Sequence, residues 1–365
     1  MGLKCGIVGL PNVGKSTLFN LLSNAKAQAA NFPFCTIEPN IGVITVPDER
    51  LNRLSDLVQP ERIVPATVDI VDIAGLVKGA SKGEGLGNQF LANIRETDAI
   101  LHVIRCFEDE NIVHVDGSIN PLRDKETIDF ELQLKDIESL EKKMDKSKRA
   151  ASTGDKEAQK TLGVIGVYIK HLESGQPART APVEEADKSL VEDAFLLTNK
   201  PVLYVCNVDE KAIIEGNQYT AQVEELAAKE GAEVLIVAAK LEAEIAELED
   251  PEERAMFLED AGLPEPGVNK LIKAAYRLLD LKTYFTAGKK EVRAWTFHKG
   301  MTAPETAGVI HSDFQKGFIK AEVIKYEDYI NIGSEQAVKE KGKMNMEGKE
   351  YVVEDGDVMN FKFNV

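Results

Sequence analysis

Residues 9–16 read Gly9-Leu10-Pro11-Asn12-Val13-Gly14-Lys15-Ser16. This is the complete spacing of a phosphate-binding loop, in which glycines let backbone N–H groups surround the phosphates, the lysine supplies a cation and the serine hydroxyl ligates Mg²⁺. An apolar run precedes the loop, and residues 17–22 follow it with the apolar spacing of a helix. The sequence therefore predicts a nucleoside triphosphate site. We expect its phosphates to contact Asn12, Val13, Gly14, Lys15, Ser16 and Thr17.

The composition is that of a globular protein with two or three domains. The chain has 365 residues, of which 43% are hydrophobic and 29% are charged. Its net charge of −17 argues against a general nucleic-acid-binding protein, because phosphate backbones favour a basic surface. No apolar run is long enough to cross a bilayer, and the first residues lead directly into the first predicted strand. We therefore expect a cytoplasmic protein without a membrane partner.

The four cysteines are scattered and lack the paired spacing of a metal site. Cys5 and Cys206 lie in strand-like runs and are expected to be buried thiols. Cys35 lies in a polar loop next to the predicted nucleotide site, so a redox-sensitive role remains an alternative there.

Strand-like apolar runs alternate with helical patterns through much of the chain. This alternation predicts an α/β fold with a mostly parallel sheet, covered by helices on both faces and binding ligands at the carboxyl ends of its strands. The phosphate-binding loop lies at such an end. The predicted strands span residues 5–9, 41–46, 67–73, 99–104, 202–206 and 234–237.

The pattern becomes purely helical between about residues 124 and 200. Apolar residues recur there at intervals of three and four, and residues 152–155 interrupt the two helical runs. This predicts an antiparallel helical hairpin inserted into the nucleotide domain. A basic cluster near its tip is either a solvated helix end or an arm that contacts RNA phosphates. The cluster consists of Lys142, Lys143, Lys146, Lys148 and Arg149.

The C-terminal part has short strand-like runs punctuated by glycines. We expect strands at 292–297, 318–323, 351–353 and 358–363. The predicted organisation is a nucleotide-binding domain over 1–281, interrupted by the helical insertion at about 124–200, and a small α+β domain over 282–365.

Two further segments are expected to complete the phosphate and metal site. The run Asp72-Ile73-Ala74-Gly75 follows a predicted strand, so Asp72 is expected to reach Mg²⁺ and the Gly75 N–H to approach the γ-phosphate. Thr36 is the expected switch threonine whose hydroxyl completes the Mg²⁺ shell.

The residue after Gly75 predicts unusual hydrolytic chemistry. Many related hydrolases place a glutamine there to orient the attacking water, whereas this chain has Leu76. Hydrolysis is then slow or uses a residue from elsewhere. His114 is a candidate because imidazole can accept a proton near neutral pH, the alternative being a loop histidine without a catalytic role. The side-chain oxygen of Asn12 could hold a monovalent cation beside the phosphates.

The segment expected to read the base is Asn207-Val208-Asp209-Glu210. Guanine-specific proteins have Asn-Lys-x-Asp there, so Val208 replaces the lysine and Glu210 replaces the aspartate that accepts from guanine. Both changes weaken guanine recognition, while the Asn207 amide can still bond adenine. In the loop after the last predicted strand, Ala238 and Ala239 could place backbone groups near the base.

Together these motifs resemble the YchF family, the Obg-related branch of translation-factor-like P-loop proteins, over essentially the whole chain. The resemblance implies a C-terminal TGS domain with a ubiquitin-like β-grasp fold. It also implies ATP in preference to GTP, Mg²⁺ held by Ser16 and Thr36, potassium dependence linked to Asn12, and His114 as a catalytic residue beside Lys15. The implied partner is the ribosome, chiefly its 50S subunit and the 70S particle, with the basic hairpin as the expected rRNA contact.

The sequence thus indicates an ATP-hydrolysing, ribosome-associated switch. An Obg-type GTPase remains an alternative, as does a ribosome-binding scaffold in which hydrolysis is incidental.

Overall fold

The computed structural model describes residues 4–24, 41–73, 86–112, 114 and 117–364. The chain divides into two compact units. The first contains the described residues up to Gly42 together with Asp69–Leu271, and the second contains Val43–Val68 together with the chain from Ile272 onward.

The first sheet has six strands in the order β2-β4-β1-β5-β6-β7, and it lies in the first unit except for residues 43–45 of β2 and 67–68 of β4. Strands β4, β1, β5, β6 and β7 pair in parallel, and every residue of β5 and β6 is buried. This confirms the predicted α/β fold. The strands are β1 (Lys4–Val8), β2 (Ile41–Thr45), β4 (Thr67–Asp72), β5 (Ala99–Arg105), β6 (Val202–Asn207) and β7 (Glu233–Val237).

Helices cover both faces of this sheet, as expected for parallel strands joined by crossovers. The helices that begin in the first unit are α1 (Lys15–Asn24), α3 (Leu86–Arg95), α7 (Gln218–Glu230), α8 (Ala239–Glu247), α9 (Pro251–Asp260) and α10 (Gly267–Leu278), of which α9 packs on α8. Within the described residues, no helix is long and apolar enough to span a membrane.

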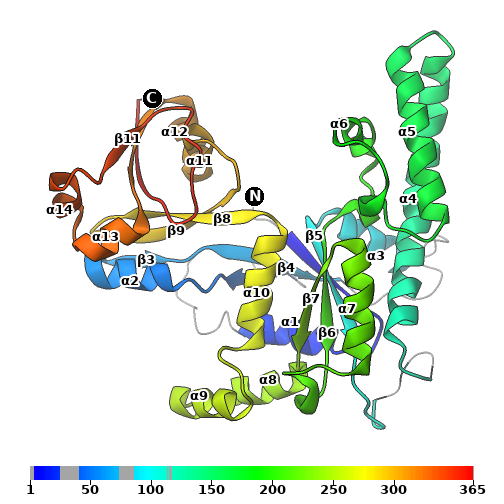
Figure 1. Ribbon diagram of the computed structural model, residues 1–365, viewed down its shortest axis with the longest axis horizontal. Coiled ribbons are helices and arrows are strands. Elements are labelled where there is room, and N and C mark those ends of the chain that lie inside the picture. Colours follow the sequence, from blue (N-terminus) through cyan, green and yellow to red (C-terminus); the bar gives the residue numbers. More distant parts are fainter. Residues whose placement is uncertain (1–3, 25–40, 74–85, 113, 115–116, 365) are drawn as a thin grey trace. The chain divides into compact units, whose positions relative to one another are not determined.

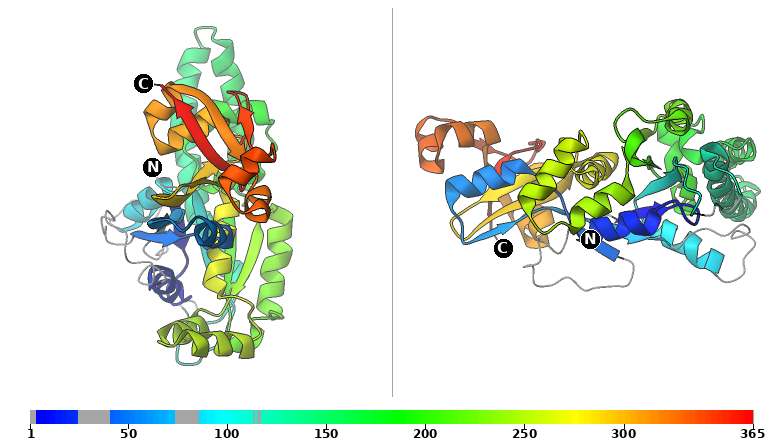
Figure 2. Two further views of the ribbon diagram at one scale, coloured as in Figure 1. Left: turned by 90° about the vertical axis from the view of Figure 1, so that its left-hand side faces the viewer. Right: turned by 90° about the horizontal axis from the view of Figure 1, so that it is seen from below.

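The predicted helical hairpin is present as α4 (Pro121–Ala151) and α5 (Lys156–Glu173). Figures 1 and 2 show the two helices side by side, joined by a short turn. Leu140 of α4 packs with Ile165, Tyr168 and Leu172 of α5 in one buried cluster, as the three- and four-residue spacing predicts. Short helices return the chain to the sheet. They are η3 (Ala178–Thr180), α6 (Glu185–Lys188), η4 (Ser189–Ala194) and η5 (Leu197–Asn199).

Buried polar contacts attach the base of the hairpin to the sheet. Lys125 of α4 forms ion pairs with Asp129 and with Glu230 at the end of α7. Arg179 also pairs with Glu230, whose carboxylate accepts a 2.7 Å hydrogen bond from the Tyr204 hydroxyl on β6. Because buried charges are stable only when paired, this network fixes the first turns of α4 against β6 and α7.

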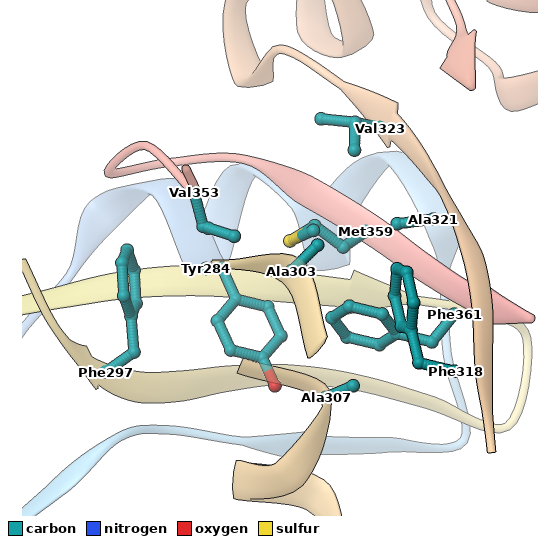
Figure 3. Close-up of a cluster of buried hydrophobic side chains, with 10 residues drawn as sticks. All are labelled: Tyr284, Phe297, Ala303, Ala307, Phe318, Ala321, Val323, Val353, Met359 and Phe361. Atoms are coloured by element: carbon teal, nitrogen blue, oxygen red, sulfur yellow. The ribbon is translucent and has the colours of Figure 1, made fainter. Parts of the chain in front are cut away.

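The second unit is a mixed six-stranded sheet in the order β11-β10-β12-β8-β9-β3. Its strands are β3 (Arg62–Val64), β8 (Leu281–Ala287), β9 (Glu291–His298), β10 (Phe318–Ile324), β11 (Asn345–Glu347) and β12 (Val358–Phe363). The helices are α2 (Glu49–Val58), α11 (Ala303–Ile310), α12 (Ser312–Lys316), α13 (Tyr326–Ile332) and α14 (Glu335–Glu340). In its core the Tyr284 ring packs against Phe297 and Phe361, each with its ring centroid 5.8 Å away (Figure 3).

The unit boundaries differ from the predicted boundary at 281/282. Residues 43–68 belong to the second unit, where β3 pairs in parallel with β9 and α2 packs on β8 and β9. The apolar face of α2 buries Leu51, Leu54 and Val58, which explains why the segment joins this sheet. The predicted strand at 351–353 is only an isolated bridge between Val352 and Thr302.

Candidate functional site

The phosphate-binding loop joins the carboxyl end of β1 to the start of α1, as predicted. Two glycines are needed for its shape. A Cβ on Gly9 would lie 2.8 Å from the Val103 carbonyl oxygen, and a Cβ on Gly14 would lie 2.1 Å from Nδ2 of Asn207. Gly14 also has φ = +93°, in the left-handed region that favours glycine.

A cavity of about 1130 Å³ opens beside this loop. Its walls come from the phosphate-binding loop, the loop after β5, the loop after β6 and one side of α8. It brings together ten of the residues expected from sequence, namely Asn12, Gly14, Lys15, Ser16, Thr17, Asn207, Val208, Glu210, Ala238 and Ala239. Val13 is buried behind the loop with 1% of its surface exposed, and it does not line the cavity, so its contact with a phosphate stays a prediction.

Asn207 ties the walls of the cavity together. Its Nδ2 donates a 2.9 Å hydrogen bond to the Val13 carbonyl, and its Oδ1 accepts a 3.0 Å bond from the Ala239 N–H. The side chain is buried, and both ends of the amide are engaged within the protein. The amide thus braces the phosphate loop against the start of α8. Because its Nδ2 carries a second N–H and Asn207 also lines the cavity, a bond from this amide to adenine stays a prediction.

The rest of the base-side segment is held by the backbone. The Val208 N–H donates to the Val237 carbonyl at 2.9 Å, and the Asp209 carboxylate accepts from the Ala212 N–H at the end of η6 (Glu210–Ala212). Glu210 is exposed and lines the cavity. A glutamate at the position of the guanine-reading aspartate therefore faces the base side of the cavity.

Helix α8 is anchored by a buried carboxylate in its first turn. Glu242 accepts a 2.9 Å hydrogen bond from the Val268 N–H at the start of α10. Burial raises the pKa of Glu242, and the N–H groups of Val268 and Gly267 partly counter that effect. The contact holds α8, and with it the base-side wall, in place.

The residues expected to bind the metal are only partly described. Lys15 Nζ pairs with the Asp72 carboxylate, and Ser16 is exposed at the start of α1. Thr36, Gly75, Cys35 and Leu76 lie outside the described residues. Among the residues that are described, no group of three His, Cys, Asp or Glu side chains could hold a metal. A hydroxyl and a single carboxylate beside a phosphate site still suit Mg²⁺, which keeps several waters and takes phosphate oxygens as ligands.

His114 lies outside the cavity wall. Its ring is buried, and Nε2 is 2.8 Å from Oδ2 of Asp124 in the first turn of α4. The residues that line the cavity do not include it. The structure thus pairs His114 with a carboxylate instead of bringing it to the phosphates.

Sequence patterns did not single out one wall of the site. Phe107, Glu108, Asp109 and Ile112 line the cavity from the loop that follows β5. No motif marks this loop. Its only sequence signal is its position after a predicted central strand, because the carboxyl ends of parallel strands share one edge.

These features define the class of the protein. A glycine-containing loop between β1 and α1, an aspartate at the end of β4 and a base-side segment after β6 make it a P-loop nucleoside triphosphate-binding protein. A family model described as "50S ribosome-binding GTPase" matches residues 4–143, and the YchF-GTPase_C model, described as "Protein of unknown function (DUF933)", matches residues 281–364.

Similar proteins specify the family. The chain is 57% identical over 365 residues to a protein of Haemophilus influenzae and 54% identical over 367 residues to one of Bacillus subtilis, and both alignments cover 100% of each chain. Both relatives are named "Ribosome-binding ATPase YchF". The solved "Structure of the Schizosaccharomyces pombe YchF GTPase" is 36% identical, with a TM-score of 0.89 and coverage of 99% of this chain and 98% of that one. The chain belongs to the YchF family.

Proposed function

We propose that this protein is a Mg²⁺-dependent ATPase that binds ATP in preference to GTP and acts on the ribosome as a translation-linked switch. The relatives from Haemophilus influenzae and Bacillus subtilis are named ribosome-binding ATPases, whereas the solved fission yeast protein is titled a GTPase. The choice of nucleotide therefore rests on the base side of the cavity.

The observation that carries the preference for ATP is the presence of Val208 and Glu210 in that wall. Guanine recognition uses a lysine along the base and an aspartate that accepts from both N1–H and the exocyclic amine. Val208 is apolar and 3% exposed, and Glu210 is a longer carboxylate set in the turn of η6. A site without that aspartate gains little binding free energy from the guanine N1–H and exocyclic amine, and it does not exclude adenine.

A competition titration tests this preference. A fluorescent ATP analogue is bound to the full chain and displaced with unlabelled ATP or GTP. We expect ATP to bind at least about tenfold more tightly than GTP. Equal or tighter binding of GTP would identify an Obg-type GTPase instead.

Mg²⁺ is proposed to be held by Ser16 and Asp72, with Thr36 completing the shell. When bound, the ion neutralises charge on the β- and γ-phosphates. Lys15 would leave Asp72 for the phosphates, and the side-chain oxygen of Asn12 would hold K⁺ nearby. We expect chelation of Mg²⁺ by EDTA to abolish turnover, and replacement of potassium by sodium to lower it.

Hydrolysis is proposed to use His114 to orient the attacking water. Because the ring contacts Asp124 and does not line the cavity, this role requires the His114 side chain to leave Asp124. His114→Ala is expected to lower kcat while leaving the ATP dissociation constant unchanged. An unaltered kcat would remove His114 from the mechanism.

The proposed partner is the large ribosomal subunit, reached through the basic tip of the hairpin. The variant Lys15→Met distinguishes such a switch from a ribosome-binding scaffold, because it removes the phosphate-binding cation. A switch should lose nucleotide-dependent co-sedimentation with ribosomes in this variant. Undiminished co-sedimentation would favour the scaffold.

A further inference from the structure

Arg105, the last residue of β5, is a buried charge held by backbone carbonyls. Only 2% of its surface is exposed. Its guanidinium donates from Nε to the Phe107 carbonyl at 3.2 Å, from Nη1 to the Ile112 carbonyl at 3.0 Å and from Nη2 to the Asp109 carbonyl at 3.3 Å. Its Cζ lies 4.6 Å from the centroid of the Phe107 ring. Among the described residues, no carboxylate forms an ion pair with it.

All three carbonyls belong to one irregular stretch, residues 107–112. Phe107, Glu108, Asp109 and Ile112 of this stretch line the nucleotide cavity, whereas Arg105 itself does not. A guanidinium presents five N–H groups in a fixed plane and can hold three separated carbonyls at once, whereas the three N–H groups of a lysine all radiate from one nitrogen. Burying a charge is costly unless it is well bonded, so these contacts are strong only while the loop keeps this shape.

We infer that Arg105 is a positioning residue, which holds loop 107–112 as a preformed wall of the nucleotide cavity. The inference rests on the proposed function, because it takes this cavity to be the ATP site. A wall that is ordered before binding spares the ligand the entropy cost of ordering it. Loss of Arg105 should therefore appear as weaker ATP binding, beyond any loss of fold stability.

The test compares two substitutions by titration calorimetry with ATP and Mg²⁺. Arg105→Met removes all three bonds, and we expect the ATP dissociation constant to rise by about tenfold. Arg105→Lys keeps the charge but cannot span the three carbonyls, so an intermediate rise is expected. Arg179→Met is the matched control because Arg179 is also largely buried but bonds Glu230, Tyr204 and the Thr198 carbonyl away from the cavity. This control should lower the unfolding midpoint without changing the dissociation constant.

Unchanged ATP affinity in a folded Arg105 variant, or an equal loss in Arg179→Met, would overturn the inference. Hydrogen exchange on the wild-type chain provides a test that needs no variant. The Asn111 and Ile112 amides donate to Asp109, at 2.9 Å and 3.2 Å, and should be protected before ATP is added. Protection that arises only with ATP would contradict a preformed wall. If the wild-type chain binds no ATP but shows this protection, the proposed function is refuted, whereas the conclusion that Arg105 orders the loop still stands.

Discussion

Gly14 and Asn207 approach each other beneath the phosphate-binding loop. A side chain at Gly14 would collide with the Asn207 amide, and that amide bonds both the Val13 carbonyl and the Ala239 N–H. The phosphate side and the base side of the cavity therefore meet at one buried amide. A small change at one glycine should affect both sides together.

Gly14→Ala is expected to displace Asn207 and to strain a backbone at φ = +93°. We expect the unfolding free energy to fall by about 2 kcal/mol or more and the ATP affinity to fall with it. Urea unfolding and titration calorimetry measure the two effects. Gly154→Ala is the matched control, because Gly154 has φ = +90° but no atom within 4 Å of its Cβ position. Equal stability losses in both variants, with ATP binding intact, would contradict the role given to this contact.

His102 on β5 is a buried imidazole beside cationic side chains. Burial, and then the charges of Lys125 on α4 and Arg179 on η3, lower its pKa from 6.5 to about 3, while Glu230 on α7 acts in the opposite direction. The ring therefore stays neutral in the folded chain when the unfolded chain is already protonated. Because the unfolded state then binds more protons, the stability due to this residue is complete above about pH 6.5 and is lost as the pH falls.

The expected loss from His102 between pH 7 and pH 5 is about 2 kcal/mol. Urea unfolding of wild type and His102→Phe at these two pH values measures it, since phenylalanine has a similar shape and no proton to bind. The wild-type chain should lose about 2 kcal/mol more than the variant. Parallel pH dependences for the two proteins would show that His102 does not contribute.

The hairpin divides the predicted basic cluster into two groups. Lys142 pairs with Glu138 of the same helix, and Lys143 pairs with Asp193 of η4. Lys146, Lys148 and Arg149 lie near the end of α4 and are all exposed, and Lys148 forms a long ion pair of 3.8 Å with Asp145. Lys142 and Lys143 form closer ion pairs than the 3.8 Å pair of Lys148 with Asp145, and a paired lysine must break its ion pair before it binds a phosphate. We therefore expect the three residues at the tip to contribute more to the proposed contact with RNA phosphates.

Reversal of the tip charges, in the triple variant Lys146→Glu, Lys148→Glu and Arg149→Glu, should weaken co-sedimentation with ribosomes. The salt dependence of binding should also become shallower, by about 0.7–0.9 in the logarithmic slope for each RNA phosphate that the variant no longer neutralises. The double variant Lys142→Glu and Lys143→Glu is the comparison, and its effect for each charge should be smaller. Unchanged binding in the triple variant would show that the cluster is a solvated helix end and does not contact RNA.

The second unit depends on a segment from far away in the sequence. Besides the β3–β9 pairing, Lys289 Nζ donates to the Val58 carbonyl at 2.9 Å, and Arg50 pairs with Asp355 at 2.9 Å. The α2 side chains of Leu51, Leu54 and Val58 supply part of its core. Residues 282–365 therefore do not contain all of this unit.

A fragment of residues 272–365 is expected to lack a cooperative thermal transition when made alone. Three buried apolar side chains of α2 account for about 5–9 kcal/mol of burial, as much as the whole stability of a small domain. The same fragment joined to residues 43–68 by a flexible linker should melt cooperatively, as followed by circular dichroism. Equal melting of the two fragments would show that the segment is dispensable.

Local sequence patterns were sufficient to predict many helices and strands, because the spacing of apolar residues in each element determines which of its faces is buried. The strands of the parallel sheet and the two hairpin helices follow from apolar runs and periodicity, and both are confirmed. The assignment of residues 43–68 to the second unit could not be predicted from sequence, because β3 pairs with β9 through backbone groups that carry no sequence signature. Strand partners are chosen by tertiary packing.

The phosphate-binding loop, which predicts a triphosphate site, was readable from sequence alone. It consists of consecutive residues whose backbone is expected to bind the phosphates, so eight positions of sequence are enough to recognise it. Tertiary structure alone decided the brace formed by Asn207, the pairing of His114 with Asp124 and the hold of Arg105 on loop 107–112. Those contacts are buried hydrogen bonds whose partners depend on how strands and helices pack, and a buried polar group bonds whichever partner the fold places beside it.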